Sequence, residues 1–215
     1  MAINEAVSEL TTGRLSVYLR CLTYLESINQ ETVSSAELAE RFHLNSAQIR
    51  KDLACFGDFG TRGVGYNVAR LKEQLVRTLG LDRTRNLLIV GAGNLGMALA
   101  DYRGFNENGF RIVALVDVDR DKTGRVSRSG IPVLLYDDLQ SVIRQRGVDI
   151  AIIAVPTESA QKVYDELVDA GINAILNFAP VQIRAHDRVK LKSVDLRINL
   201  ESLSFFLKNI EDGTL

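Results

Sequence analysis

The feature that most constrains the fold is the glycine-rich segment Gly91-Ala92-Gly93-Asn94-Leu95-Gly96. It follows the apolar residues 86–90 and precedes the small apolar residues 97–100, an order typical of a strand, a tight turn and a helix. In such a unit the first glycine allows the turn, the second lets a pyrophosphate approach the backbone, and the third lets the helix pack against the strand. Unpaired N–H groups at the start of the helix hold the phosphate charge. The sequence therefore predicts a dinucleotide site at residues 91–96.

A carboxylate follows at the spacing that such a site needs. Residues 111–117 have the pattern of the next strand, and this strand ends in Asp117, about twenty residues after Gly96. An acid at this position binds the adenine ribose hydroxyls and repels the 2′-phosphate of NADP, so NAD is favoured. Arg120 and Lys122 leave NADP open as the lesser alternative. The expected adenosine half of the site comprises Asp117, Val118, Asp119 and Lys122.

The rest of this region alternates short apolar runs with helical patterns, which indicates a Rossmann-like, doubly wound parallel sheet. Strands are expected near residues 131–134, 149–155 and 173–178, with helices at 137–145 and 158–170. Ligands bind beyond the carboxyl ends of such strands, so residues there should surround the nicotinamide. They are Val155, Pro156, Asn177, Phe178, Ala179 and Pro180. Because most of these are apolar, and burying a charged ring is costly, we expect the neutral NADH to be preferred over NAD⁺.

The first 80 residues indicate a winged-helix domain. Residues 12–29 have the spacing of an amphipathic helix, and Ser34 with Glu37 forms a capping box for a second helix. Asn45 or Ser46 can cap a third helix that runs to Phe56. The glycine-rich residues 59–66 suggest a wing, and a further helix is expected over 68–79. Two short helices joined by a tight turn form a helix-turn-helix.

Charge in this domain favours DNA as its target. Residues 41–72 hold six basic side chains and two acidic ones, whereas the whole chain has a net charge of −1. Basic side chains supply the phosphate contacts on which affinity for DNA depends. A protein-interaction module with a solvated basic face remains the alternative. The expected DNA contacts on the third helix and the wing are Ser46, Gln48, Arg50, Lys51, Arg62, Gly63 and Tyr66, with Arg62 in the minor groove.

Composition narrows the cellular context. Cys21 and Cys55 form neither a disulfide framework nor a metal cluster, which suits a reducing cytoplasm. The first residues lack a signal pattern, and no apolar run is long enough to span a bilayer. We therefore expect a cytoplasmic protein without a membrane partner or a metal.

Catalytic groups are not evident in the sequence. Only His43 and His186 are present, no Tyr-x-x-x-Lys pair occurs, and no substrate domain follows the sheet. A final apolar helix over residues 199–210 must pack against its own domain or against a dimer partner. These features favour a nucleotide-sensing regulator. The alternatives are an NAD-dependent oxidoreductase with a helical N-terminal accessory domain and a winged-helix regulator that senses coenzyme A.

The combined pattern resembles the Rex family of bacterial redox-sensing repressors over nearly the whole chain. The segments that carry the resemblance are residues 48–53, 56–66, 91–96, 102–105, 117–119 and 176–180, with Arg103 as one departure. The resemblance implies a homodimer, NADH as an effector that is not consumed, and a palindromic operator in double-stranded DNA as the target. It also implies a domain-swapped C-terminal helix and repression of NADH-reoxidation genes that ends when NADH accumulates.

The resemblance further implies roles for single residues. Phe105 is expected to reach into the nicotinamide pocket and Tyr102 to report on its occupancy. Arg20 and Asp195 correspond to a switchable ion pair, so the implied switch is Arg20, Tyr102 and Asp195. The expected domains are a winged helix at residues 1–80, a nucleotide domain at 84–198 and a dimerisation helix at 199–210.

Overall fold

The computed structural model describes residues 9–57, 59–61, 64–106 and 109–214. The chain divides into two compact units, Met1–Arg83 and Thr84–Leu215. The division falls in the short segment that the sequence places between the two predicted domains.

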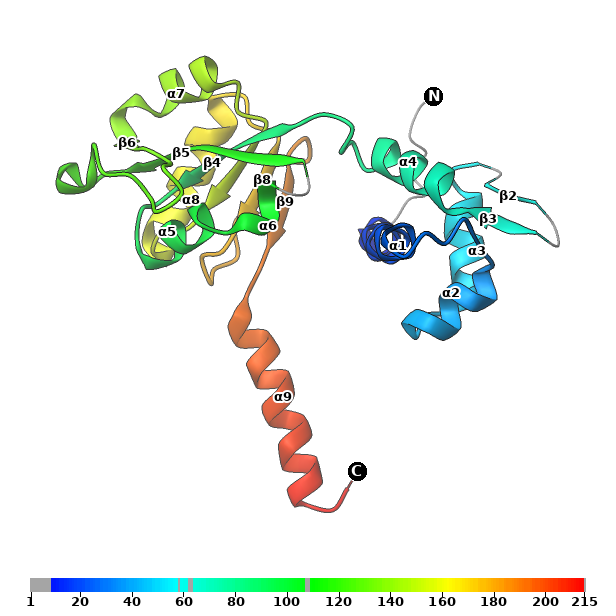
Figure 1. Ribbon diagram of the computed structural model, residues 1–215. Coiled ribbons are helices and arrows are strands. Elements are labelled where there is room, and N and C mark those ends of the chain that lie inside the picture. The colour runs from blue at the N-terminus through cyan, green and yellow to red at the C-terminus, as the bar shows by residue number, and fades with distance from the viewer. Residues whose placement is uncertain (1–8, 58, 62–63, 107–108, 215) are drawn as a thin grey trace. The chain divides into compact units, whose positions relative to one another are not determined.

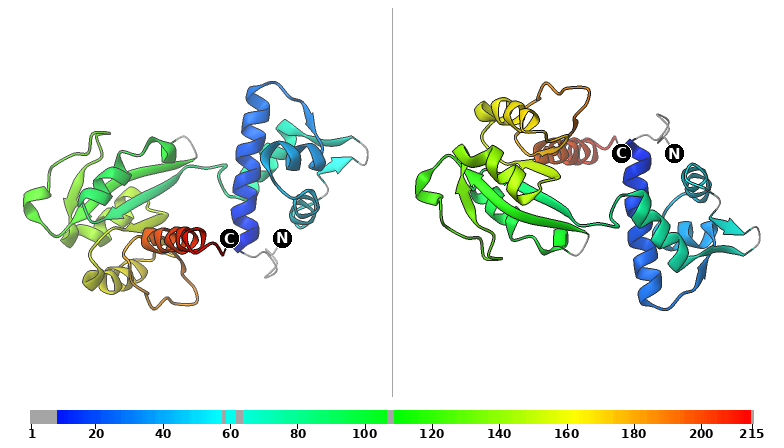
Figure 2. Two further views of the ribbon diagram at one scale, coloured as in Figure 1. Left: turned by 90° about the horizontal axis from the view of Figure 1, so that it is seen from below. Right: turned by 90° about the horizontal axis from the view of Figure 1, so that it is seen from above.

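The first unit is built around four helices, α1 (Glu9–Ser27), α2 (Ser35–Phe42), α3 (Ser46–Ala54) and α4 (Val68–Thr78). Helix α1, the blue helix in Figure 2, lies along one side of this unit and packs against α4. Leucines at helical spacing on α1 enter the core, which confirms the predicted amphipathic pattern. The fully buried side chains in the core of this unit include Leu15, Leu22, Leu25, Leu38, Ile49, Leu71 and Leu75.

Side-chain caps set the ends of the two central helices. The Ser34 hydroxyl accepts a hydrogen bond from the N–H of Glu37 at 3.0 Å, as the capping pattern predicts. Asn45, rather than Ser46, caps α3, since its side-chain oxygen accepts from the N–H of Gln48 at 3.0 Å. Helix α3 ends at Ala54, short of the predicted Phe56.

A small antiparallel sheet completes this unit, with strands in the order β1-β3-β2. The predicted wing supplies β2 (Gly60–Thr61) and β3 (Gly65–Asn67). Strand β1 (Thr32–Val33) was not predicted, because two residues are too few to show an alternating pattern. Gly65 has φ +92°, and a Cβ there would lie 2.6 Å from the carbonyl oxygen of Val33, so glycine is needed at this crossing.

The second unit contains a six-stranded sheet in the order β6-β5-β4-β7-β8-β9, with every neighbouring pair parallel. This order, with the first strand at the centre, is that of a Rossmann fold and confirms the predicted doubly wound sheet. The strands are β4 (Arg85–Val90), β5 (Phe110–Asp117), β6 (Val133–Leu135), β7 (Ile150–Ile153), β8 (Ala174–Asn177) and β9 (Lys190–Ser193).

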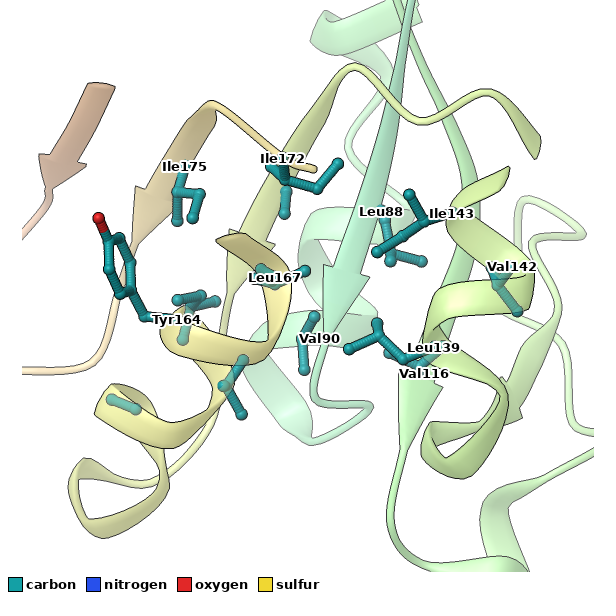
Figure 3. Close-up of a cluster of buried hydrophobic side chains, with 14 of the residues drawn as sticks. Leu88, Val90, Val116, Leu139, Val142, Ile143, Tyr164, Leu167, Ile172 and Ile175 are labelled. Atoms are coloured by element: carbon teal, nitrogen blue, oxygen red, sulfur yellow. The ribbon is translucent and has the colours of Figure 1, made fainter. Parts of the chain in front are cut away.

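Helices cover both faces of the sheet because alternate strand residues point to opposite sides (Figure 1). Leu88 and Val90 face α7 (Leu139–Arg146) and α8 (Thr157–Asp169), and Figure 3 shows this cluster. Leu87 and Ile89 face the other side, which is covered by α5 (Asn94–Ala100) and α6 (Arg103–Asn106). A short 3₁₀ turn, η1 (Arg120–Lys122), follows β5, and a second, η2 (Tyr136–Asp138), lies between β6 and α7.

The last helix, α9 (Leu196–Glu211), extends away from the sheet (Figure 1). It begins before residue 199, where the sequence placed the boundary, because Asp195 caps it by accepting a hydrogen bond from the N–H of Arg197 at 2.8 Å. Within the described part of this chain, α9 has no buried residue. Its apolar side chains therefore remain uncovered in the single chain.

Gly96→Ala should destabilise the nucleotide-binding unit. A Cβ at Gly96 would lie 1.8 Å from the carbonyl oxygen of Gly91, so α5 would have to move away from β4. Overpacking of this kind costs about 1–3 kcal/mol. Gly93→Ala is the matched control, because a Cβ there meets nothing within 4 Å. Calorimetric melts should show a lower Tm for Gly96→Ala only, and equal Tm values would contradict the close approach.

Candidate functional site

The three glycines of the turn between β4 and α5 have three different environments. Gly91 adopts φ +105°, and a Cβ there would lie 2.4 Å from the carbonyl oxygen of Ala154, which directly follows the neighbouring strand β7. At Gly96 a Cβ would lie only 1.8 Å from the carbonyl oxygen of Gly91. At Gly93 the space is open, as it must be for a phosphate to reach the backbone. Asn94 and Leu95 form the first turn of α5 directly after Gly93.

The Asp117 carboxylate joins the turn to the neighbouring strand. Its Oδ2 accepts the N–H of Ala92 at 2.7 Å and the ammonium group of Lys122 at 3.1 Å. Its Oδ1 accepts the N–H of Asp119 at 2.9 Å. Oδ1 thus receives one described bond and keeps a lone pair, which a ribose hydroxyl can use.

Burial alone would raise the pKa of Asp117, which is 7% exposed. Hydrogen bonds from the N–H groups of Asp119 and Ala92, together with Lys122, outweigh burial and hold the pKa below its ordinary value. The group is therefore ionised at neutral pH. Lys122 also lies 3.7 Å from the carboxylate of Asp119, so one cation faces two carboxylates.

A cavity of about 330 Å³ opens at the carboxyl ends of β4, β5, β6 and β7. This is at the lower end of the volumes typical of small-molecule sites. The structure brings eight of the predicted residues together in its wall: Gly91, Gly93, Asp117, Val118, Asp119, Lys122, Val155 and Pro156.

The sequence reasoning missed part of the wall. Tyr136 directly follows β6 and lines the cavity, and its hydroxyl donates to Glu166 at 2.7 Å. The rule that ligands lie beyond strand ends would have found Tyr136. Ser159 and Val163 of α8 also line the cavity, but only the packing of α8 against the sheet places them there.

Two of the six residues predicted for the nicotinamide half, Val155 and Pro156, line this cavity, whereas Asn177, Phe178, Ala179 and Pro180 lie outside its wall. Asn177 is fully buried, and its amide donates to the carbonyl oxygen of Ala179 at 3.0 Å and accepts from the N–H of Ala179 at 2.9 Å. The same amide lies 3.3 Å from the hydroxyl of Ser193. Asn177 therefore positions the loop that carries Phe178, Ala179 and Pro180, and its side-chain donors are used within the protein.

Tyr102 immediately precedes α6, and Phe105 is part of that helix. Tyr102 is 58% exposed, and its ring packs edge-to-face with that of Phe105 at a centroid distance of 5.0 Å. A Cβ on Gly104 would lie 2.6 Å from the Tyr102 ring, so glycine permits this edge-to-face contact. Phe105 itself packs against the core between the sheet and α5.

Helix α3 presents most of the predicted DNA contacts. Arg50 and Lys51 are exposed, and Ser46 and Gln48 are partly buried in the first turn. The Arg50 guanidinium donates to the Ser35 hydroxyl at 2.9 Å, so it is held toward the start of α2. Tyr66 is partly buried against the core of this unit. Arg62 and Gly63 lie outside the described residues.

The two residues of the predicted switchable ion pair, Arg20 and Asp195, lie in different units. Arg20 is exposed on α1, whereas Asp195 is partly buried at the start of α9. In the described ranges, no cluster of His, Cys, Asp or Glu side chains is arranged to hold a metal ion. None of the helices described here is both long and apolar enough to cross a membrane.

A nucleotide cleft on a Rossmann sheet, preceded by a winged helix with a basic recognition helix, defines the class of ligand-responsive DNA-binding regulators. Family models agree with this division. One described as "Putative DNA-binding protein N-terminus" matches residues 6–54, and one described as "CoA binding domain" matches residues 82–181.

Similarity to known proteins extends over nearly the whole chain. The redox-sensing transcriptional repressor Rex of Carboxydothermus hydrogenoformans is 50% identical over 202 residues, covering 94% of this chain and 97% of that protein. Rex of Desulfitobacterium hafniense is 46% identical over 93% of this chain and 94% of that protein. The structure of RSP with beta-NAD+ and operator DNA matches with a TM-score of 0.91 and 38% identity. The match covers 97% of this chain and 95% of the RSP chain. RSP with beta-NADH matches with a TM-score of 0.84 and 37% identity, covering 97% of each chain.

The chain belongs to the Rex family of redox-sensing transcriptional repressors. It is therefore a regulator and not an enzyme, which confirms the prediction and disfavours the oxidoreductase alternative.

Asp117→Asn should lower the stability of the protein by about 1–3 kcal/mol at neutral pH, because a buried acceptor of three hydrogen bonds loses its charge. A carboxyl with a lowered folded pKa stabilises fully above its unfolded pKa of about 3.9 and ceases to do so as the pH falls through the folded pKa. The difference in unfolding free energy between the two proteins should therefore shrink below about pH 4 in urea melts. The exposed Asp121→Asn is the control, and a pH-independent difference for Asp117→Asn would contradict the ionised state.

Proposed function

We propose that this protein acts as a homodimer that represses transcription from a palindromic operator and releases it when NADH occupies the nucleotide domain. The observation that carries the proposal is the cleft at Asp117, joined in one chain to a winged helix with an exposed basic α3. The solved relative RSP, described with operator DNA and with both redox forms of the dinucleotide, supports it. The cytoplasm, where DNA and the dinucleotide pool meet, is the proposed location.

The charge at the cleft favours NAD(H) over related nucleotides. The ribose of NAD offers two free hydroxyls to Asp117, whereas NADP and coenzyme A each carry a phosphate on the same ribose. Such a phosphate would meet the carboxylates of Asp117 and Asp119, against the single positive charge of Lys122. Arg120 is too exposed to compensate, since its side chain is 81% accessible and pairs with Asp137 at 3.8 Å.

The far end of the dinucleotide distinguishes the redox states. Val155 and Pro156 continue the cavity wall toward the loop of Phe178, Ala179 and Pro180, which offers no charged side chain. An oxidised ring carries a positive charge that such surroundings would leave unpaired, and the reduced ring does not. NADH is therefore the form that stabilises the DNA-released state, with Tyr102 and Phe105 at the ring.

Helix α9 supplies the proposed dimer contact. All of its large apolar side chains are at least half exposed in the single chain: Leu196, Ile198, Leu200, Leu203, Phe205, Phe206, Leu207 and Ile210. An exposed apolar patch of this kind marks an interaction surface. The proposed occupant is a second copy of the chain, with α9 exchanged between subunits.

The dimer explains how a ligand can act on DNA. Two recognition helices reach successive major grooves only when they are roughly 34–36 Å apart or a multiple of that. NADH at the subunit interface would change this spacing, and the Arg20–Asp195 pair would form in one of the two states. Because coupling is reciprocal, operator DNA must weaken NADH binding by the same factor.

NADH should release the operator, and NAD⁺ should do so much less. The usual range of allosteric coupling predicts a loss of DNA affinity of about 5- to 150-fold. Fluorescence anisotropy of a labelled operator, titrated at fixed total dinucleotide with a varying NADH:NAD⁺ ratio, measures it. If both forms release DNA equally, or neither does, redox sensing by this protein is contradicted. Release of the operator by coenzyme A, and by neither form of the dinucleotide, would favour the alternative of a winged-helix regulator that senses coenzyme A.

Two variants separate the DNA site from the nucleotide site. Arg50→Ala should weaken operator binding and leave NADH affinity unchanged, because Arg50 lies on α3 in the first unit. Gly93→Leu should bind the operator but no longer respond to NADH, because the side chain fills the open space at the phosphate turn.

Phe206→Glu should convert the dimer to a monomer at micromolar concentration, because a charge would be buried in the proposed interface. Sedimentation equilibrium measures the change. Glu201→Gln is the matched control, since Glu201 is exposed and pairs with Arg197 on the same helix. A dimer that survives Phe206→Glu unchanged would show that α9 does not form the interface.

A further inference from the structure

A buried carboxylate on the inner side of the recognition helix receives four hydrogen bonds. Asp52 of α3 is 2% exposed. It accepts from the Nε and Nη2 of Arg14 on α1 at 2.5 and 2.8 Å, and from the hydroxyl of Tyr18 on α1 at 2.9 Å. The fourth donor is the side-chain amide nitrogen of Gln48, at 2.7 Å. Three of the donors tie α3 to α1, and the fourth belongs to α3 itself.

The charge of Asp52 decides which way the Gln48 amide points. Burial would raise the pKa of Asp52, but hydrogen bonds from Arg14, Gln48 and Tyr18 outweigh it and hold the pKa below its ordinary value. An ionised carboxylate only accepts hydrogen bonds, so it must face the NH₂ group and not the oxygen of the amide. The Gln48 oxygen is therefore turned away from Asp52. Among the described residues it has no hydrogen-bond partner, and it is not buried.

Gln48 lies where a recognition helix meets the edges of bases. It is the third residue of α3, and its backbone N–H is the one capped by Asn45. Residues in the first turn of such a helix point into the major groove. The side chain is partly buried, so it runs from Asp52 inside the unit to the surface that α3 presents.

We propose that Asp52 is a positioning residue that fixes Gln48 with its amide oxygen toward the DNA, so that Gln48 selects a base with an exocyclic amine in the major groove. This inference rests on the proposed function of operator binding. Adenine offers N6 and cytosine offers N4 to such an acceptor. Guanine and thymine present carbonyl oxygens instead, and two acceptors would face one another.

The Asp52→Asn variant follows from the same geometry. An asparagine amide can donate as well as accept, so the Gln48 amide can reverse and present its NH₂ group. The variant should then tolerate guanine or thymine at the position that Gln48 contacts. Tyr18→Phe is the matched control, because it removes one donor to Asp52 and leaves the carboxylate charged.

The first experiment selects operators from a randomised DNA library with the full-length dimer. Wild type should enrich adenine or cytosine at one base of each half-site, and Gln48→Ala should lose the preference at that base only. Lys51→Ala, the control for a phosphate contact, should weaken all sequences alike. A guanine or thymine preference at that base, or an unchanged preference with Gln48→Ala, would overturn the inference.

The second experiment deletes the amine at that base by replacing adenine with purine or cytosine with 2-pyrimidinone. Wild type should lose about tenfold in affinity, which corresponds to about 1.4 kcal/mol, and Gln48→Ala should lose almost nothing more. The analogue that weakens binding identifies the base. Equal losses of affinity for wild type and Gln48→Ala would overturn the inference. This test does not require the Asp52→Asn variant to fold.

Circular dichroism first establishes that Asp52→Asn is folded, since Arg14 loses a charged partner in it. A folded Asp52→Asn that keeps the wild-type selectivity would show that Asp52 does not orient Gln48. These results are distinct from a failure of the proposed function, in which wild type would enrich no sequence at all.

Discussion

The contact between the Asp117 carboxylate and the N–H of Ala92 joins the parts on which the nucleotide site depends. It fixes the glycine turn after β4 to the end of β5, and through Asp119 and Lys122 it also orders the loop that follows. We propose that the same carboxylate also separates NAD from nucleotides with a phosphorylated ribose. One buried anion therefore shapes the turn and holds the loop at the place where the proposed ligand would bind. Its cost of burial is offset by donors that the protein itself supplies.

The first unit uses a buried carboxylate in a similar way. Asp52 accepts from Arg14 and Tyr18 of α1 and from Gln48 of its own helix, so α1 and α3 are held as one body. In both units, an anion that accepts hydrogen bonds from several donors fixes one element to its neighbour.

The two ends of the nucleotide site differ in what holds them. The cavity that we propose for the adenosine end is lined by residues of one chain. At the proposed nicotinamide end, Asn177 holds the loop through Ala179 and also reaches Ser193, the last residue of β9. The loop that we propose meets the nicotinamide ring contacts this buried amide directly, and the helix that we propose joins the subunits begins three residues after Ser193. We therefore propose the Asn177 amide as a short physical route from the ligand to the dimer contact.

Patterns local in the chain were enough to predict the glycine turn, Asp117, the Ser34 cap, the parallel sheet and the winged helix, because each depends on spacing or on residue type. The sequence also predicted the class of regulator, from the winged-helix pattern that precedes the nucleotide domain and from the resemblance to the Rex family. Other features were decided only by tertiary structure. Ser159 and Val163 enter the cavity because α8 packs on the sheet, β1 exists because β3 offers it a partner, and the Gln48 amide is oriented by a carboxylate that Arg14 and Tyr18 keep buried. These depend on contacts between residues far apart in the chain, which no local pattern records.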